Sequence, residues 1–200
     1  MSLPNYRLDD LSEQEYLEVE KISDVKHEYF DGACYAMAGA SINHQRLIAT
    51  LTGKLWAHLN GSPCEVFSSD IKVRADNGTK YFYPDVLVSC DNHDGNSHFT
   101  ETPRLIIEVL SSSTRKYDRT LKRGCYQTIP SLEEYVLIEQ DVVQIEVCRK
   151  SDNWQASFYY IDDDVTFTTV GLTLSVLEIY QRVENEELRS FKHTQPNFLN

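Results

Sequence analysis

The clearest hydrophobic pattern in this 200-residue chain runs from position 43 to 60, where apolar residues recur every three or four positions. This spacing places them in one stripe and predicts a helix that ends at Gly61, a residue that readily adopts the backbone conformation found after helix ends. The members of the stripe are Leu47, Ile48, Leu51, Leu55 and Leu59.

Short apolar runs over 82–89 and 104–110 predict two strands. Both runs are apolar on successive residues, which is typical of strands covered on both faces, so we expect them to be central neighbours in one sheet. We expect further strands over 64–74, 134–140, 143–149, 154–161 and 165–170, a helix over 114–128, and a last short helix over 174–183.

Two local signals organise the first 40 residues. Ser12 and Glu15 have the spacing of a capping box and predict a short helix over 11–22. Asp31 and Gly32 separate two runs that favour strands, and Asp-Gly supplies the positive φ angles of a two-residue hairpin turn.

The order of these elements predicts an α/β fold, an α+β mixed sheet in which the helix over 114–128 crosses between the strands over 104–110 and 134–140. No repeat or linker divides the chain. We therefore expect a single domain over 1–200, with short flexible tails at about 1–8 and 190–200.

The composition, with 41% hydrophobic and 25% charged residues, is that of a folded globular protein. No apolar run approaches the roughly 20 residues that span a bilayer, and the acidic start does not resemble a signal peptide, so we expect no membrane association. The five cysteines are odd in number and widely spaced, which indicates neither a CxxC metal site nor a dense disulfide framework. We expect a cytoplasmic protein.

The net charge of −12 argues against a protein whose whole surface binds nucleic acid. The charge is uneven, however. The segment 104–123 holds six basic and two acidic residues, whereas 133–200 holds thirteen acidic and five basic residues. Any contact with nucleic acid is therefore expected from the basic helix, through Arg115, Lys116, Arg119 and Arg123.

Two acidic residues occupy positions where a carboxylate is costly. Asp85 begins an apolar strand, and Glu108 lies inside the run Leu-Ile-Ile-Glu-Val-Leu. An ionised carboxylate in such a place needs a cation, a set of hydrogen bonds, a metal ion or a water-filled cleft. On the following helix, Asp118 and Lys122 are four residues apart and share one face.

An Asp, a Glu on a neighbouring strand and a Lys on the next helix are the components of a metal-dependent phosphodiester hydrolase. Mg²⁺ prefers oxygen ligands and keeps several waters, so two carboxylates and a backbone carbonyl hold it and leave positions open. An ammonium group beside the attacking water stabilises the developing negative charge.

The motifs that carry these residues resemble those of the PD-(D/E)xK, restriction-endonuclease-like superfamily, and more closely those of its Uma2 family (DUF820), over about residues 10–180. They are Glu28-Tyr29-Phe30-Asp31-Gly32, Met37-Ala38, Ala40-Ser41, His44, Ser69-Asp70-Ile71-Lys72-Val73, Pro84-Asp85-Val86, the segment Glu108-Val109-Leu110-Ser111 with the residues after it, Asp118, Lys122, and Glu134-Tyr135-Val136-Leu137-Ile138.

The resemblance implies a restriction-endonuclease-like core with flanking helices and additional C-terminal antiparallel strands. It also implies an endonuclease that hydrolyses phosphodiester bonds, expected in DNA, with Mg²⁺ or its substitute Mn²⁺ as the cofactor. Asp85, Glu108 and the Val109 carbonyl would hold the metal. The signature Lys is replaced by Leu110, so Lys122 becomes the expected catalytic cation, with Arg115 or Lys116 as alternatives.

Other residues of the matching motifs are accessory candidates with simpler alternatives: Glu28 as an exposed hairpin residue, His44 as a helix cap, and Asp118 as a surface partner of Lys122; Asp70 belongs to the same group. Oligomerisation, as a homodimer, would extend the basic surface. Two other functions stay open: a catalytically silent nuclease fold that binds nucleic acid or a protein, and an acid cluster that is purely structural.

Overall fold

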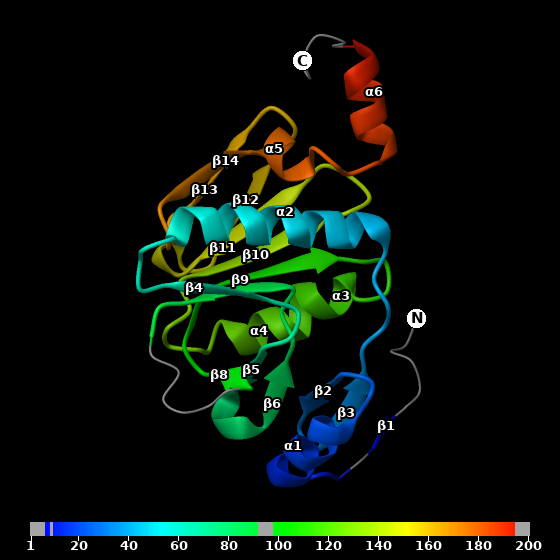
Figure 1. The fold of residues 1–200 in the computed structure, drawn as a ribbon, viewed down its shortest axis with the longest axis vertical. Coiled ribbons are helices and arrows are strands. Elements are labelled where there is room, and N and C mark those ends of the chain that lie inside the picture. Colours follow the sequence, from blue (N-terminus) through cyan, green and yellow to red (C-terminus); the bar gives the residue numbers. More distant parts are fainter. Residues whose placement is uncertain (1–6, 9, 92–97, 195–200) are drawn as a thin grey trace.

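A six-stranded mixed sheet built from the most apolar strands lies at the centre of the protein (Figure 1). The computed structural model describes residues 7–8, 10–91 and 98–194. Strands β9 and β10 pair in parallel, and every other neighbouring pair of this sheet is antiparallel. In order across the sheet, the strands are β12 (Ala156–Tyr159), β11 (Ile145–Arg149), β10 (Glu134–Glu139), β9 (Pro103–Leu110), β7 (Val86–Ser89) and β4 (Glu65–Ser68).

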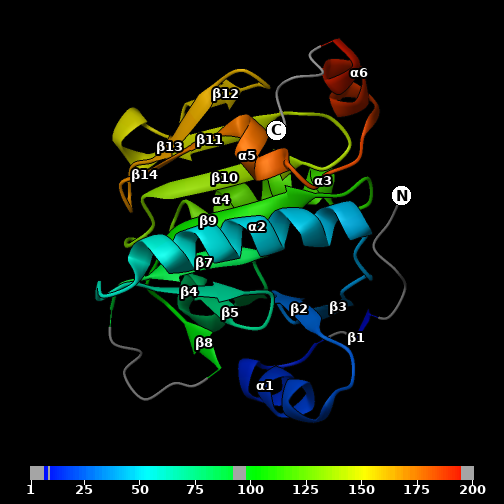
Figure 2. The same ribbon diagram turned by 45° about the horizontal axis from the view of Figure 1, so that its top comes forward.

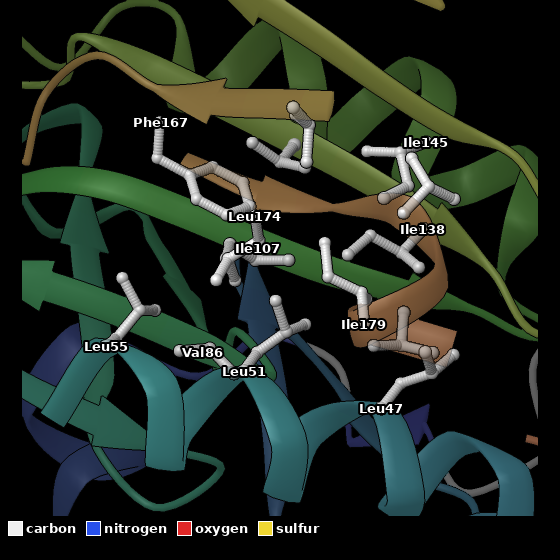
Figure 3. Packing of buried hydrophobic residues seen from close by; sticks show 14 of the residues in the cluster. Leu47, Leu51, Leu55, Val86, Ile107, Ile138, Ile145, Phe167, Leu174 and Ile179 are labelled. Atoms are coloured by element: carbon white, nitrogen blue, oxygen red, sulfur yellow. The ribbon is translucent and has the colours of Figure 1, made fainter. Parts of the chain in front are cut away.

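Helices cover both faces of this sheet. Helix α2 (Ile42–Leu59) lies on one face, where Leu47, Leu51 and Leu55 are fully buried and point toward the strands (Figure 3). The other face is covered by a continuous helical segment of α3 (Arg115–Tyr117), the π-helical turn η2 (Asp118–Lys122) and α4 (Arg123–Tyr126). This segment connects β9 to β10, so the predicted crossover and the predicted neighbours β7 and β9 are confirmed.

A second six-stranded sheet packs with the N-terminal helix α1 (Glu13–Ile22). Tyr16 of α1 is fully buried and its ring stacks on that of Tyr29, with the ring centroids 4.8 Å apart. The strands in order are β1 (Arg7–Leu8), β3 (Ala33–Ala36), β2 (His27–Phe30), β6 (Lys80–Phe82), β5 (Lys72–Ala75) and β8 (Phe99–Thr100), with the short helix η1 (Asp76–Gly78) between β5 and β6.

The local signals of the N-terminal region are confirmed. Ser12 caps α1 and forms the reciprocal capping box with Glu15. Strands β2 and β3 form a hairpin in which Asp31 and Gly32 have φ angles of 46° and 89°. Both angles are positive, as a two-residue hairpin turn requires.

Two predicted strands are each divided between the two sheets. The run 64–74 forms β4 and β5, with Ser69 at a φ of 60° between them, and the run 82–89 contains the end of β6 and the whole of β7. Prediction of one continuous strand was wrong in both cases, because an apolar run does not reveal that the chain passes from one sheet to another. Asp85 consequently lies immediately before β7.

The C-terminal region contains more structure than predicted. Strands β13 (Asp164–Phe167) and β14 (Leu172–Ser175) pair, and α5 (Val176–Tyr180) follows. Helix α6 (Glu186–Thr194) projects at the top of Figure 1 and extends into the expected tail from about 190. The 3₁₀ turn η3 (Lys150–Asp152) links β11 and β12. Neither β14 nor α6 was predicted.

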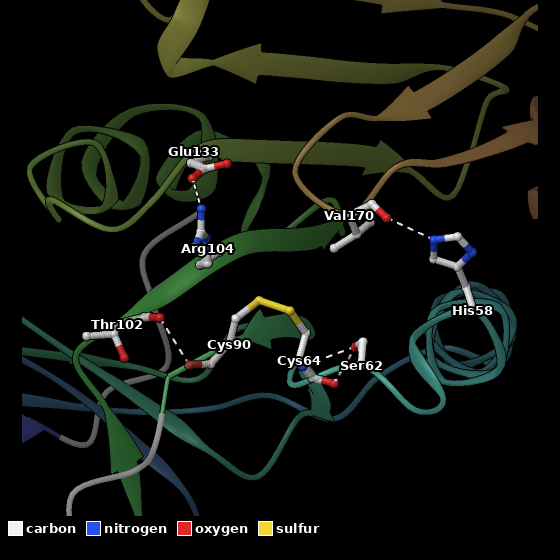
Figure 4. Close-up of a disulfide and its surroundings, with 9 residues drawn as sticks. His58, Ser62, Cys64, Cys90, Thr102, Arg104, Glu133 and Val170 are labelled. Carbon is white, nitrogen blue, oxygen red and sulfur yellow. Dashed lines mark hydrogen bonds and ion pairs between the residues drawn. A yellow bond between two sulfur atoms is a disulfide. The ribbon is translucent and has the colours of Figure 1, made fainter.

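A disulfide joins Cys64 and Cys90 at one end of the β4–β7 pair (Figure 4). The antiparallel register that places Glu65 opposite Ser89 brings these cysteines together, although 26 residues separate them. The widely spaced cysteines gave no indication of this pairing. None of the helices in the part of the chain that the structure describes combines the length and apolar character needed to span a bilayer.

Candidate active site

The two predicted metal carboxylates lie side by side at one end of the β7–β9 pair. The register places Val86 opposite Ile107, so Asp85 comes next to Glu108. The backbone N–H of Asp85 donates to Glu108 Oε2 at 3.4 Å, and the N–H of Val109 donates to Asp85 Oδ2 at 2.7 Å. The backbone therefore fixes both carboxylates relative to the same strand end.

Lys122 reaches Glu108 from the π-helical turn on the sheet's second face. Its Nζ lies 2.7 Å from Glu28 Oε1, 3.2 Å from Glu108 Oε1 and 3.3 Å from Asp118 Oδ1. All four side chains are buried, with between 3% and 8% of their surface exposed. Isolated π turns in helices are frequent at functional sites, and this one places Asp118 and Lys122 together as their spacing predicted. We name Glu28, Glu108, Asp118 and Lys122 the acid–lysine cluster.

The acid–lysine cluster carries more negative charge than its ammonium group compensates. Burial raises the pKa of Glu108 well above its ordinary value and also raises that of Glu28. Burial alone would lower the pKa of Lys122, but the carboxylates of Glu108, Glu28 and Asp118 outweigh it and raise that pKa. The lysine is thus held as a cation, and the surplus carboxylates favour the uptake of a proton or another cation.

His44 joins the site from the first turn of α2. Its Nε2 lies 3.3 Å from Asp85 Oδ2, and both side chains are about one-seventh exposed. Burial opposes protonation, but the hydrogen bond and charge of Asp85 outweigh it and raise the pKa of His44. The helix cap itself is Ser41, whose Oγ accepts the His44 backbone N–H at 3.1 Å. The imidazole is therefore free of the capping role and faces the carboxylate.

The donor set fits a hard divalent cation held by few protein ligands. Asp85 and Glu108 offer carboxylate oxygens at one strand end, and Asp118 Oδ1 is buried with only the ion-pair contact to Lys122. Among the described residues, no three His, Cys, Asp or Glu side chains surround one point as metal ligands. Mg²⁺ prefers oxygen ligands and keeps several waters, so it needs few ligands from the protein.

Some predicted site residues lie elsewhere. Asp70 pairs with Lys26 on the surface. Arg115 binds Glu139, and the three arginines of the crossover segment are engaged by acidic side chains of the sheet, so Arg115 is not the cation of the acid–lysine cluster. Lys116 is exposed. Leu110, at the position of the signature lysine, is fully buried in the apolar core.

Tyr126 is a site residue that sequence reasoning missed. Its hydroxyl donates to Glu108 Oε1 at 3.1 Å, from a ring that is fully buried. The spacing offered a signal, because Tyr126 follows Lys122 by four positions and so continues the face that carries Asp118. Glu28 is likewise not an exposed hairpin residue, since only 6% of its surface is accessible.

The mixed α/β fold is shared with a solved structure. A crystal structure described as a "putative nuclease belonging to DUF820" from Anabaena variabilis superposes with a TM-score of 0.71, covering 87% of this chain and 99% of that one, at 16% identity. At this identity the match establishes the shared fold.

The chain belongs to the Uma2 family. The family model, described as "Putative restriction endonuclease", matches residues 13–179. Two proteins of Synechocystis sp. PCC 6803 are similar: slr1290 is 39% identical over 181 residues, covering 89% of this chain and 95% of its own length, and sll1609 is 37% identical over 143 residues, covering 70% and 81%. Both carry the description "uncharacterized protein".

Proposed function

We propose that this protein is a metal-dependent endonuclease that hydrolyses phosphodiester bonds in DNA. The observation that carries the proposal is the pair of carboxylates, Asp85 and Glu108, at one strand end, with Lys122 Nζ 3.2 Å from Glu108 Oε1. Membership of a family described as "Putative restriction endonuclease" supports the same chemistry.

Asp85, Glu108 and the Val109 carbonyl would hold Mg²⁺ or Mn²⁺. When bound, such an ion polarises a phosphoryl oxygen and lowers the pKa of a coordinated water. Lys122 stabilises negative charge that develops beside Glu108, in the manner of the signature lysine that Leu110 replaces. Glu28 and Asp118 act as positioning residues, because their carboxylates hold the Lys122 ammonium in the acid–lysine cluster.

Cleavage of supercoiled plasmid and of single-stranded DNA tests this function. Native protein with Mg²⁺ or Mn²⁺ should nick or cut, and EDTA should abolish the reaction. Asp85→Asn, Glu108→Gln and Lys122→Ala should each lower the rate by at least about 100-fold, the effect typical of removing a group that stabilises transition-state charge. Asp70→Asn, a matched change to a surface carboxylate, should cleave like the native protein.

Cutting that survives EDTA, or that survives both Asp85→Asn and Glu108→Gln, would contradict the proposal. DNA binding without cutting under every metal condition would instead identify a catalytically silent nuclease fold. The homodimer and the cytoplasmic location stay predictions, which sedimentation and cell fractionation test directly.

A further inference from the structure

The basic helix predicted to contact nucleic acid has its arginines committed within the protein. Arg115 makes hydrogen bonds of 2.7–3.0 Å to Glu139, while Arg119 and Arg123 bind Glu146. Glu139 and Glu146 are 5% and 2% exposed. Moving the guanidinium groups to phosphates would leave these carboxylates buried without a counter-charge, which is strongly unfavourable. The three arginines are therefore poorly available for phosphate contacts.

The outward side of α2, unlike the basic helix, carries basic residues that are not paired with buried carboxylates. In a chain with a net charge of −12, the eighteen residues of α2 include no Asp or Glu. A groove of about 660 Å³ runs along this side, between α2 and the residues that follow α5. Figure 2 shows α2 at the front with α5 beside it. The cationic residues that line the groove are Arg46, Lys54 and Arg182.

These three cations are available to a ligand. Arg46 lies 3.2 Å from Glu184 and Lys54 lies 2.9 Å from Glu178, but the two acidic side chains are 71% and 48% exposed. Water can solvate such carboxylates when the cation moves away, so exposed pairs of this kind contribute little stability. Arg182 is exposed, and no carboxylate among the described residues forms an ion pair with it.

The groove starts at the N-terminal end of α2, the helix that also supplies His44 to the candidate active site. Ser41 lines its start and caps α2, and three residues later His44 contacts Asp85 at 3.3 Å. Arg46 and Lys54 are eight residues apart, about 12 Å along a helix. That distance corresponds to three or four nucleotide steps of a DNA strand at roughly 3.4 Å each. The small residues Ala49 and Gly53 lie between them and leave room for a backbone to approach.

We propose that this groove, with Arg46, Lys54 and Arg182, binds the sugar-phosphate backbone of the DNA substrate. The proposal rests on the proposed nuclease function and replaces the basic helix as the main phosphate-binding surface. We name this surface the α2 groove. Trp56, two residues beyond Lys54 on α2, is 66% exposed.

Binding of fluorescein-labelled single-stranded and duplex oligonucleotides, measured by anisotropy with Ca²⁺ in place of Mg²⁺ at about 50–200 mM salt, tests the proposal. Replacing the three groove cations together, in Arg46→Gln/Lys54→Gln/Arg182→Gln, should weaken binding at least about tenfold at the lowest salt. It should also reduce the slope of log affinity against log salt by roughly 3, about 1 for each phosphate that the variant no longer neutralises.

Two matched controls remove one positive charge outside the groove. Lys150→Gln lies on η3 and Lys21→Gln on α1, and both lysines are exposed. Both variants should keep the native slope of log affinity against log salt. In a Trp154→Phe background, Trp56 is the remaining tryptophan, and its fluorescence should change when the oligonucleotide is added.

A triple variant that binds and cuts DNA like the native protein would overturn the α2 groove and leave the nuclease function intact. Native protein that binds through the groove but never cuts would uphold the groove and contradict the nuclease function. Sedimentation adds a further outcome: if Ile42→Lys and Trp56→Lys convert a dimer to a monomer without changing DNA affinity, the α2 groove is a contact with a second copy and the proposal is wrong.

Discussion

Lys122 is one ammonium group among three buried carboxylates, and this imbalance distinguishes the acid–lysine cluster from an ordinary buried ion pair. In a balanced pair, loss of either partner leaves an uncompensated charge. Here the removal of one carboxylate relieves repulsion, whereas removal of the cation increases it. The two kinds of substitution therefore have opposite expected effects on the metal-free protein.

Lys122→Met should lower the free energy of unfolding in EDTA by about 3 kcal/mol or more, because it leaves the buried carboxylates without a counter-charge. Asp118→Asn should be neutral or stabilising, since it removes surplus charge and keeps the side-chain shape. Urea unfolding followed by circular dichroism measures both. If Asp118→Asn destabilises the protein as much as Lys122→Met does, the cluster is a balanced structural site and has no need of a further cation.

At the scale of elements, α1 is attached to the second sheet through Glu13. Arg74 of β5 donates to Glu13 Oε1 at 2.6 Å, as does the Tyr81 hydroxyl of β6. The hydrogen bond from Arg74, opposed by partial burial, lowers the pKa of Glu13 below its ordinary value of 4.5. Because the folded-state pKa is lowered, this contribution to stability is present above about pH 4.5 and is lost as the pH falls through the folded-state pKa.

Glu13→Gln should therefore destabilise the protein modestly at pH 7, by less than about 1 kcal/mol for a partly exposed pair. The difference from native protein should shrink as the pH is lowered from 5 to 3, as unfolding free energies across that range can check. A difference that grows toward low pH would contradict the assignment. A separate check is Gly78→Ala. Gly78 has a φ of 87°, and a Cβ added there would overlap the Glu13 carboxylate. The substitution should therefore loosen the attachment of α1 to the second sheet.

The disulfide ties the edge strand β4 to β7 and closes a loop with a sequence separation of 26 residues. A loop of this size restricts the unfolded chain enough to stabilise the folded protein by roughly 3 kcal/mol in the chain-entropy model. Reduction, or Cys64→Ser/Cys90→Ser, should lower the unfolding free energy by up to that amount. Thiol titration of denatured protein without reductant should count three free thiols, and a count of five would show that the bond does not form.

Prediction from the sequence succeeded where a signal was local. The capping box at Ser12, the Asp31-Gly32 turn and the leucine stripe of α2 each depend on a few neighbouring residues, and each was confirmed. The divided strands and the Cys64–Cys90 pair depend on how distant segments meet, which periodicity cannot report. Burial of single residues also depends on distant contacts. The sequence therefore did not reveal that Glu139 and Glu146 would be buried and would bind the arginines of the crossover segment.

At the scale of the whole molecule, two sheets and two helical segments bring the candidate site together from distant parts of the chain. Glu28 comes from the hairpin, His44 from α2, Asp85 and Glu108 from the central sheet, and Lys122 from the crossover. The family motifs selected these residues, but their contacts required the structure. We infer that the assembled site holds a divalent cation, and the proposed nuclease activity depends on that ion.

Electron paramagnetic resonance of added Mn²⁺ can establish whether the site holds such a cation, because this experiment does not depend on finding the right DNA substrate. Native protein should bind Mn²⁺, and excess Mg²⁺ should displace it. Asp85→Asn and Glu108→Gln should weaken binding at least about tenfold, whereas Lys122→Met, which removes a positive charge, should bind Mn²⁺ as tightly as the native protein or more tightly. Native protein that binds no Mn²⁺, or binds it equally well after both carboxylate substitutions, would show that the site is not a metal centre.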